Sequence, residues 1–112
     1  MKHRPERVAN LIKEELSKII SRELEFSGYL VTVIDVVVNK KLEQAIIKFS
    51  VLPSENSETA FKILEKNCGY LQHLLVRKIN IKPMPKITFE IDRGPEKLAK
   101  IEKILIEDKM KQ

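Results

Sequence analysis

Apolar residues in the first quarter of the chain recur at the three-and-four spacing that lines one side of an α-helix. The stripe consists of Val8, Leu11, Ile12, Leu16, Ile19 and Ile20. Pro5 stands just before it and suits the first turn of a helix, where its missing N–H would have no partner anyway. The pattern therefore predicts a helix from Pro5 to about Leu24, and Gly28 ends that region.

Two strand-like segments follow. Residues 30–38 are nearly all β-branched or aliphatic, with Thr32 and Asp35 the only polar residues, so we expect a central strand that is buried on much of both faces. Residues 45–51 alternate between apolar and polar positions, which is typical of a half-buried strand. The polar residues 39–44 between them predict a hairpin connection.

The hairpin has one register that satisfies both faces. Pairing Val38 with Ala45 places core residues opposite core residues and opposite charges side by side. The expected pairs are Val36 with Ile47, Ile34 with Phe49, and Asp35 with Lys48.

The second half of the chain predicts two helices and a third strand. Ser57 with the acids around it makes a good helix start. An apolar stripe then runs through Ala60, Phe61, Leu64, Cys68, Leu71, Leu75 and Ile79. Gly69 interrupts this stripe, and an interior glycine costs a helix about 1 kcal/mol relative to alanine. We therefore expect two helices joined at Gly69.

The prolines Pro83 and Pro85 exclude further helix, and residues 86–92 alternate as a third strand with Ile87, Phe89 and Ile91 inward. Pro95 can open a short C-terminal helix over about 95–108. The order predicts an α+β fold in which a three-stranded sheet carries its helices on one face, and the length predicts a single domain over residues 1–112.

The face of the sheet without helices should be mixed to acidic. It would show Asp35, Lys48, Thr88, Glu90 and Asp92, whereas Phe49 and Phe89 point to the core. An open face without aromatic rings offers no platform for stacked bases, so we do not expect RNA recognition there.

Positive charge is unevenly placed along the chain. Lys and Arg number 21 against 16 acids, and no acid occurs from Lys66 to Phe89. A second basic excess at the start comprises Lys2, Arg4, Arg7, Lys13, Lys18 and Arg22. On the helix after Gly69, the residues Tyr70, His73 and Arg77 fall on one side, with Lys66 nearly aligned. Clustered cations indicate a polyanion approached through its phosphates, and the alternative is an ordinary solvated surface.

The sequence offers little for catalysis. Cys68 and His73 are five positions apart, which on a helix leaves them roughly 140° apart, so they do not form a nucleophile and base pair. His3 and His73 have no second ligand at metal spacing, and no phosphate-binding glycine loop occurs. We therefore expect no enzyme, no metal, no cofactor and no small-molecule substrate.

Neither a secretory signal nor a membrane span is expected, because no apolar stretch follows residues 1–5 and no apolar run approaches about 20 residues. The single Cys68 cannot form an internal disulfide. These observations predict a cytoplasmic protein.

Four segments resemble the ribosome-binding factor A family, small KH-like proteins of bacteria and organelles. They are "RPERVANLIKEELSKII", "VTVIDVVVNKKLEQAIIKFSV", "FKILEKNCGYLQHLLVRKINIK" and "PKITFEID". The resemblance covers nearly the whole chain, from Arg4 to about Ile106. Each segment is modest alone, but their order and spacing are specific.

The resemblance implies a type II KH-like fold in which a kink between two helices, commonly Ala-x-Gly, replaces the usual GxxG loop. Asn67-Cys68-Gly69 would occupy this kink, where Gly69 would let the backbone turn and approach RNA. The sequence departs from the family at Asn67, where alanine is usual, at Gln72, where a basic residue is frequent, and at Lys41, where aspartate is common.

The resemblance also implies a monomeric, non-enzymatic factor that binds the small (30S) ribosomal subunit, helps the precursor of its 16S rRNA mature and is needed especially in the cold. The residues expected to hold rRNA are Lys66, Asn67, Gly69, Tyr70, His73, Arg77, Lys78, Lys82 and Lys86, assisted by Arg4 and Arg7. Two alternatives remain: a general module for single-stranded RNA, and a protein-interaction module in which the cations are incidental.

Overall fold

The structure, a computed structural model, describes residues 4–94. Its elements follow the order helix, strand, strand, helix, helix, strand, which confirms the expected α+β, KH-like fold. They are α1 (Arg4–Glu23), β1 (Leu30–Val38), β2 (Gln44–Leu52), the short 3₁₀ helix η1 (Ser54–Asn56), α2 (Ser57–Lys66), α3 (Cys68–Lys78) and β3 (Lys86–Ile91). The C-terminal helix expected over 95–108 lies outside the described residues.

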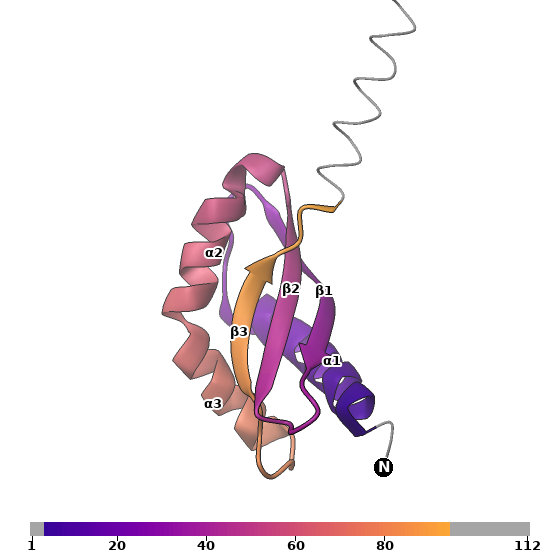
Figure 1. Ribbon diagram of the computed structural model, residues 1–112. Helices are drawn as coiled ribbons and strands as arrows, with labels where there is room; N and C mark the ends of the chain where they lie inside the picture. The colour runs from indigo at the N-terminus through magenta and orange to yellow at the C-terminus, as the bar shows by residue number, and fades with distance from the viewer. Residues whose placement is uncertain (1–3, 95–112) are drawn as a thin grey trace, which may run out of the picture.

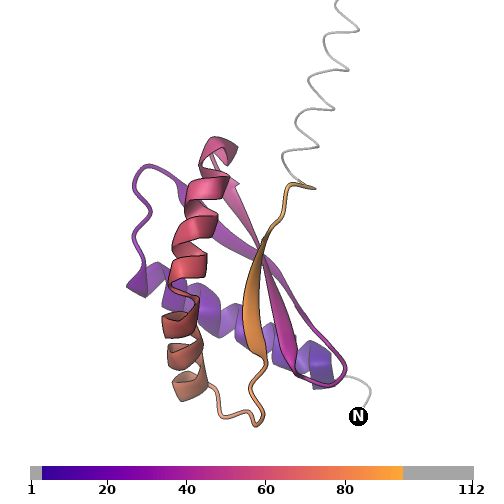
Figure 2. The same ribbon diagram turned by 60° about the vertical axis from the view of Figure 1, so that its left-hand side comes forward.

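The three strands form one mixed sheet in the order β1-β2-β3. β2 pairs with β1 in the antiparallel sense and with β3 in the parallel sense. Figures 1 and 2 show α1 crossing one face of the sheet, with α2 and α3 following each other along the β3 side. The core lies between this face and the helices, and its fully buried large side chains include Ile12, Leu16, Ile47, Phe49, Leu64, Leu71 and Leu75.

The expectation that residues 30–38 form the central strand is wrong, because β1 lies at an edge and β2 is in the middle. Only Val33 and Val36 of β1 are buried. β-branched side chains suit any pleated surface, including one that is half exposed, so a run of them does not fix a strand's place in the sheet.

The predicted hairpin register holds over the half of the hairpin nearest the turn. Val38 pairs with Ala45, Val36 with Ile47 and Asp35 with Lys48.

Beyond Asp35 the register shifts by one residue, so Phe49 pairs with Val33 and the expected partner Ile34 is wrong. The irregularity lies between Val33 and Asp35, which makes Ile34 the extra residue of a β-bulge. An alternating pattern cannot reveal a bulge when the residues around it are all aliphatic.

The open face of the sheet carries the exposed polar residues Asp35, Thr88 and Glu90, as expected. The ring of Phe49 packs on the helix side, edge-on to Phe89 at 6.2 Å and stacked with Phe61 at 6.4 Å. The open face is more apolar than predicted, however, because the cross-strand pair Leu30 and Leu52 is 61% and 64% exposed.

The break between α2 and α3 falls at Asn67, two residues before the expected junction at Gly69. Asn67 has φ −97° and ψ 6°, and both its backbone N–H and its side-chain Nδ2 donate to the carbonyl of Ile63, at 3.1 and 2.8 Å. Its own carbonyl accepts from the N–H of Leu71 at 2.9 Å and so begins α3. Asn67 therefore ends one helix and starts the next.

Gly69 lies in the first turn of α3, and nothing in the fold requires a glycine there. Its φ is outside the left-handed region, which among the glycines of residues 4–94 only Gly28 adopts, at φ 84°. A Cβ added at Gly69 would meet no atom within 4 Å. The expectation that Gly69 lets the backbone turn is thus wrong, and the glycine leaves an uncovered patch of helix surface.

A polar clamp fixes α3 to the outer edge of β3. The side chain of Gln72 donates from Nε2 to the carbonyl of Pro85 at 2.9 Å and accepts at Oε1 from the N–H of Ile87 at 2.8 Å. The thiol of Cys68 donates to the carbonyl of Ile87 at 3.3 Å. Side chains of α3 thus occupy the backbone groups that a fourth strand would use, and Gln72 is structural.

Replacing Gly69 with alanine should raise the free energy of unfolding by about 0.5–1 kcal/mol, because alanine restricts the unfolded chain and fits the helix without a clash. Urea denaturation measures this change. Gly28→Ala is the control, since its left-handed backbone disfavours a Cβ and it should lose stability. A Gly69→Ala protein that unfolds at lower urea would contradict this reading.

Replacing Gln72 with methionine, which keeps the length of the side chain, should lower the free energy of unfolding by about 1–3 kcal/mol. The loss arises because the N–H of Ile87, a fully buried residue, would have no partner. His73→Ala on the exposed side of the same helix should change it by less than about 0.5 kcal/mol. Equal urea midpoints for Gln72→Met and the unaltered protein would show that the clamp contributes nothing.

Candidate nucleic-acid interface

Helix α3 presents the predicted stripe to solvent. Gly69, Tyr70, His73 and Arg77 are exposed, and the core residues Leu71 and Leu75 anchor the opposite side of the helix. The remaining predicted site residues are exposed as well, except Asn67, which is half-buried at the junction. The stripe separates two flanks of the helix, one toward α1 and one toward β3.

The start of α3 is tied to the end of α1 through a tyrosine. The hydroxyl of Tyr70 donates to Oε2 of Glu23 at 3.2 Å, and Nε of Arg22 donates to Oε1 of the same carboxylate at 3.1 Å. The hydrogen bond from its hydroxyl to Glu23 raises the pKa of Tyr70, with a smaller opposing effect from Arg22. Tyr70 as a whole is 49% exposed, so part of it remains open to a partner.

A groove of 360 Å³ lies between α1 and α3. Cations from both helices line it, together with two aliphatic side chains and one acid: Lys18, Arg22, Arg77, Lys78, Ile19, Leu74 and Glu15. Lys18 and Arg22 were not among the predicted site residues. The basic excess at the start of the sequence includes both, but only the packing of α1 on α3 brings them beside Arg77.

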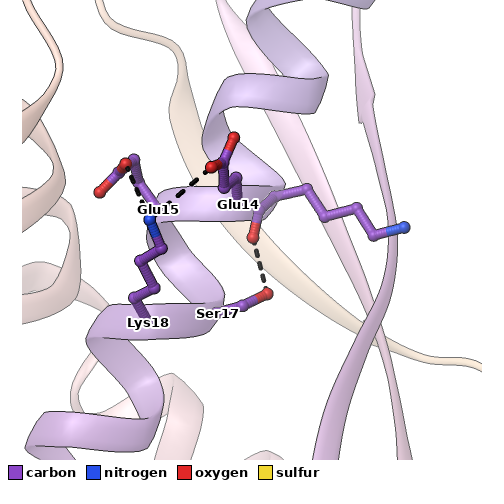
Figure 3. A network of polar contacts seen from close by, with 5 residues as sticks. Glu14, Glu15, Ser17 and Lys18 are labelled. Atoms are coloured by element: carbon purple, nitrogen blue, oxygen red, sulfur yellow. Dashed lines mark hydrogen bonds and ion pairs between the residues drawn. The ribbon is translucent and has the colours of Figure 1, made fainter.

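The single acid of the groove is paired with a lysine that also contacts a second carboxylate. Figure 3 shows the ammonium of Lys18 between two carboxylates, 3.6 Å from Oε1 of Glu14 and 3.7 Å from Oε1 of Glu15. The side chain of Glu15 is only 15% exposed, whereas that of Lys18 is 63% exposed. One ammonium thus serves two carboxylates, and the excess positive charge at the rim comes from Arg77 and Lys78, which have no ion-pair partner among residues 4–94.

The flank toward β3 holds Lys66 at the end of α2 and Lys86 at the start of β3. The thiol of Cys68 lies near Lys86, and burial raises its pKa. The positive charge of Lys86 partly opposes this rise, and the negative charge of Glu65 adds to it. A half-buried, protonated thiol that donates to a backbone carbonyl is structural. Lys82 lies in the loop between α3 and β3 and is exposed.

The structure does not bring Arg4 and Arg7 to the surface of α3. They lie in the first turns of α1, and Arg7 precedes Lys18 by about 16 Å of helix. Figures 1 and 2 both show the N-terminal end of α1 on the side of the molecule away from α2 and α3. Any contact that these arginines make is separate from the α3 stripe.

Residues 4–94 contain neither a cluster of metal-binding side chains nor a helix that could span a membrane. Within residues 4–94, no three His, Cys, Asp or Glu side chains gather in a way that could hold a metal ion. Over the same residues, no helix is long and apolar enough to cross a bilayer.

Comparisons with known proteins agree on one family. A sequence profile described as ribosome-binding factor A matches residues 4–105. A ribosome-binding factor A from Coxiella burnetii (strain Dugway 5J108-111) is 32% identical over 113 residues, which cover 100% of this chain and 94% of that relative.

Solved structures share the fold. The crystal structure of ribosome-binding factor A from Thermus thermophilus superposes with a TM-score of 0.71 at 20% identity, covering 80% of this chain and 98% of that one. A homology model of the Thermus thermophilus factor, fitted into a cryo-EM map of its complex with the 30S subunit, gives a TM-score of 0.65 at 22% identity, covering 76% and 91%. Because the profile spans nearly all of its residues and a relative is 32% identical over the whole length of this chain, the chain belongs to the ribosome-binding factor A family.

Proposed function

We propose that this protein is a non-enzymatic assembly factor that binds the small ribosomal subunit and promotes maturation of its 16S rRNA precursor. The observation that carries the proposal is the exposed end of α3, where Arg77 and Lys78 have no ion-pair partner among residues 4–94. Cations held on a rigid helix without acidic partners are free to replace the counterions of a phosphate backbone. The 30S complex of a relative supports the choice of RNA.

The proposed contact surface follows α3 and the segments at its two ends. It comprises Lys66, Asn67, Gly69, Tyr70, His73, Arg77, Lys78, Lys82 and Lys86, while Arg4 and Arg7 would make a second, separate contact. The uncovered helix surface at Gly69 would let an RNA backbone approach α3 closely. Phosphate contacts would supply most of the affinity, and the shape of the rRNA would select the site.

The same proposal includes the form in which the protein acts. It would work as a monomer of one domain in the cytoplasm, without a cofactor, a metal or a small-molecule substrate. Its role would be greatest in the cold, as the family resemblance implies.

A protein-interaction module is the second candidate, and one observation favours it. Leu30 and Leu52 form an exposed apolar surface on the open face of the sheet, of the kind that a protein partner can cover. Binding that resists nuclease and does not change with salt would favour this module.

A general single-stranded RNA module would be displaced from subunits equally well by any RNA of the same length.

Replacing Arg77 and Lys78 together with glutamate should weaken binding to purified small subunits by about 25-fold or more at about 0.1 M salt, since each lost phosphate contact costs about fivefold there. Binding is measured by co-sedimentation with the subunits. Both residues are exposed, so the urea midpoint should stay close to that of the unaltered protein.

The matched control reverses the two exposed lysines of the hairpin turn, Lys40→Glu and Lys41→Glu, with the same change in net charge. An affinity that falls equally in both double variants would show that only net charge matters. An unchanged affinity in the Arg77 and Lys78 variant would remove α3 from the interface.

A further inference from the structure

We propose that the groove between α1 and α3 holds a single-stranded segment of RNA, with its phosphates on cations of both helices. This inference rests on the proposed function and extends it to a site that includes two residues of α1, Lys18 and Arg22. It names the form of RNA recognised there.

The first support is the arrangement of charge. Lys18 and Arg22 lie one turn apart on α1 and line the groove together with the adjacent residues Arg77 and Lys78 of α3. Lys18 is shared between Glu14 and Glu15, and Arg22 is paired with Glu23. Ion pairs made by exposed lysines and arginines are weak, so a phosphate can compete with these carboxylates. A line of positive charge on both walls of a channel tracks a phosphate backbone better than a flat patch does, because successive phosphates meet successive cations.

The second support is the size and the floor of the groove. Its 360 Å³ lies at the lower end of the range for small-ligand sites, about 300–1,000 Å³. A groove of this size takes about one base with its ribose, so the neighbouring phosphates would lie on the cations at its rim, and it is too small to admit a double helix. The aliphatic floor consists of Ile19, which is only 2% exposed, and the half-buried Leu74, against which a ribose or the face of a base can exclude water.

The third support is the rigidity of the walls. The bond from Tyr70 to Glu23 joins the two helices at one end of the groove, and the same carboxylate orients Arg22 through Nε. With Nε occupied, the terminal nitrogens of the Arg22 guanidinium still have N–H groups to donate to a phosphate. The exposed ring of Tyr70 lies at this end, where the next base of a strand can stack on it.

The test replaces Lys18 and Arg22 together with glutamine and measures binding of a decauridine at about 0.1 M salt by fluorescence anisotropy. Loss of two single-strand phosphate contacts should weaken binding by about 25-fold and reduce the slope of log K against log salt by about 1.4. The control, Lys40→Gln with Lys41→Gln, removes the same charge outside the groove and should change the affinity by less than about threefold. Equal losses in the two double variants would overturn the proposal.

A second measurement reports on the groove itself. The methyl signals of Ile19 and Leu74 in an NMR spectrum should shift when decauridine is added and stay unchanged with an RNA duplex of equal charge. Shifts of equal size with the duplex, or none with decauridine, would contradict a single-stranded occupant.

The two proposals fail in different ways. If the Arg77 and Lys78 variant loses small-subunit binding while the Lys18 and Arg22 variant binds decauridine like its control, the groove proposal alone is wrong. If the unaltered protein binds decauridine in the groove but does not bind small subunits, the proposed function is wrong and the groove serves another RNA.

Discussion

The burial of Leu71 and Leu75 beneath α3 is the contact on which the proposed interface depends. Both side chains are fully buried, and through them the helix packs into the core between α1 and the sheet. A helix of about three turns is marginal on its own in water, so this packing is what holds α3 in shape. It places the basic end of the helix, with Arg77 and Lys78, at a fixed position beside α1.

Polar contacts then set the position of α3 on each side. Toward β3, Gln72 and Cys68 bond to the backbone of Ile87, and toward α1, Tyr70 bonds to Glu23. A helix fixed on both flanks keeps its outward side chains in constant relative positions. Such an arrangement suits recognition of RNA by shape, because the spacing of the cations is built into the protein before RNA arrives.

Much of the fold could be predicted from the sequence, since the apolar periodicity of α1, β2 and β3 alone fixed their type and their bounds to within about two residues. The edge position of β1 and its bulge could not be predicted, because a run of Val and Ile carries no information on which face or neighbour each residue has.

Gly69 was a misleading indicator of where α2 ends and α3 begins. Glycine suggests a break in a helix, but here the side chain of Asn67 makes the break by capturing the carbonyl of Ile63.

The candidate site was predictable in part. The acid-free stretch contains every cation of α3, and their exposure follows from the helical spacing around Leu71 and Leu75. Lys18 and Arg22 were missed because they lie far away along the chain and join the groove only through tertiary packing. At Gln72 the sequence showed only a departure from the basic residue that is frequent in the family. Its structural role depends on the edge of β3, which no local pattern describes.

Binding to the small subunit through phosphate contacts can be tested by sedimentation of a lysate through sucrose gradients at low and at high salt, with the tagged protein located in each fraction. We expect co-migration with free small subunits at low salt, absence from large subunits and full ribosomes, and loss of the association at high salt, because phosphate contacts weaken steeply as salt rises. A protein that stays at the top of the gradient at low salt, where those contacts are strongest, would contradict this expectation.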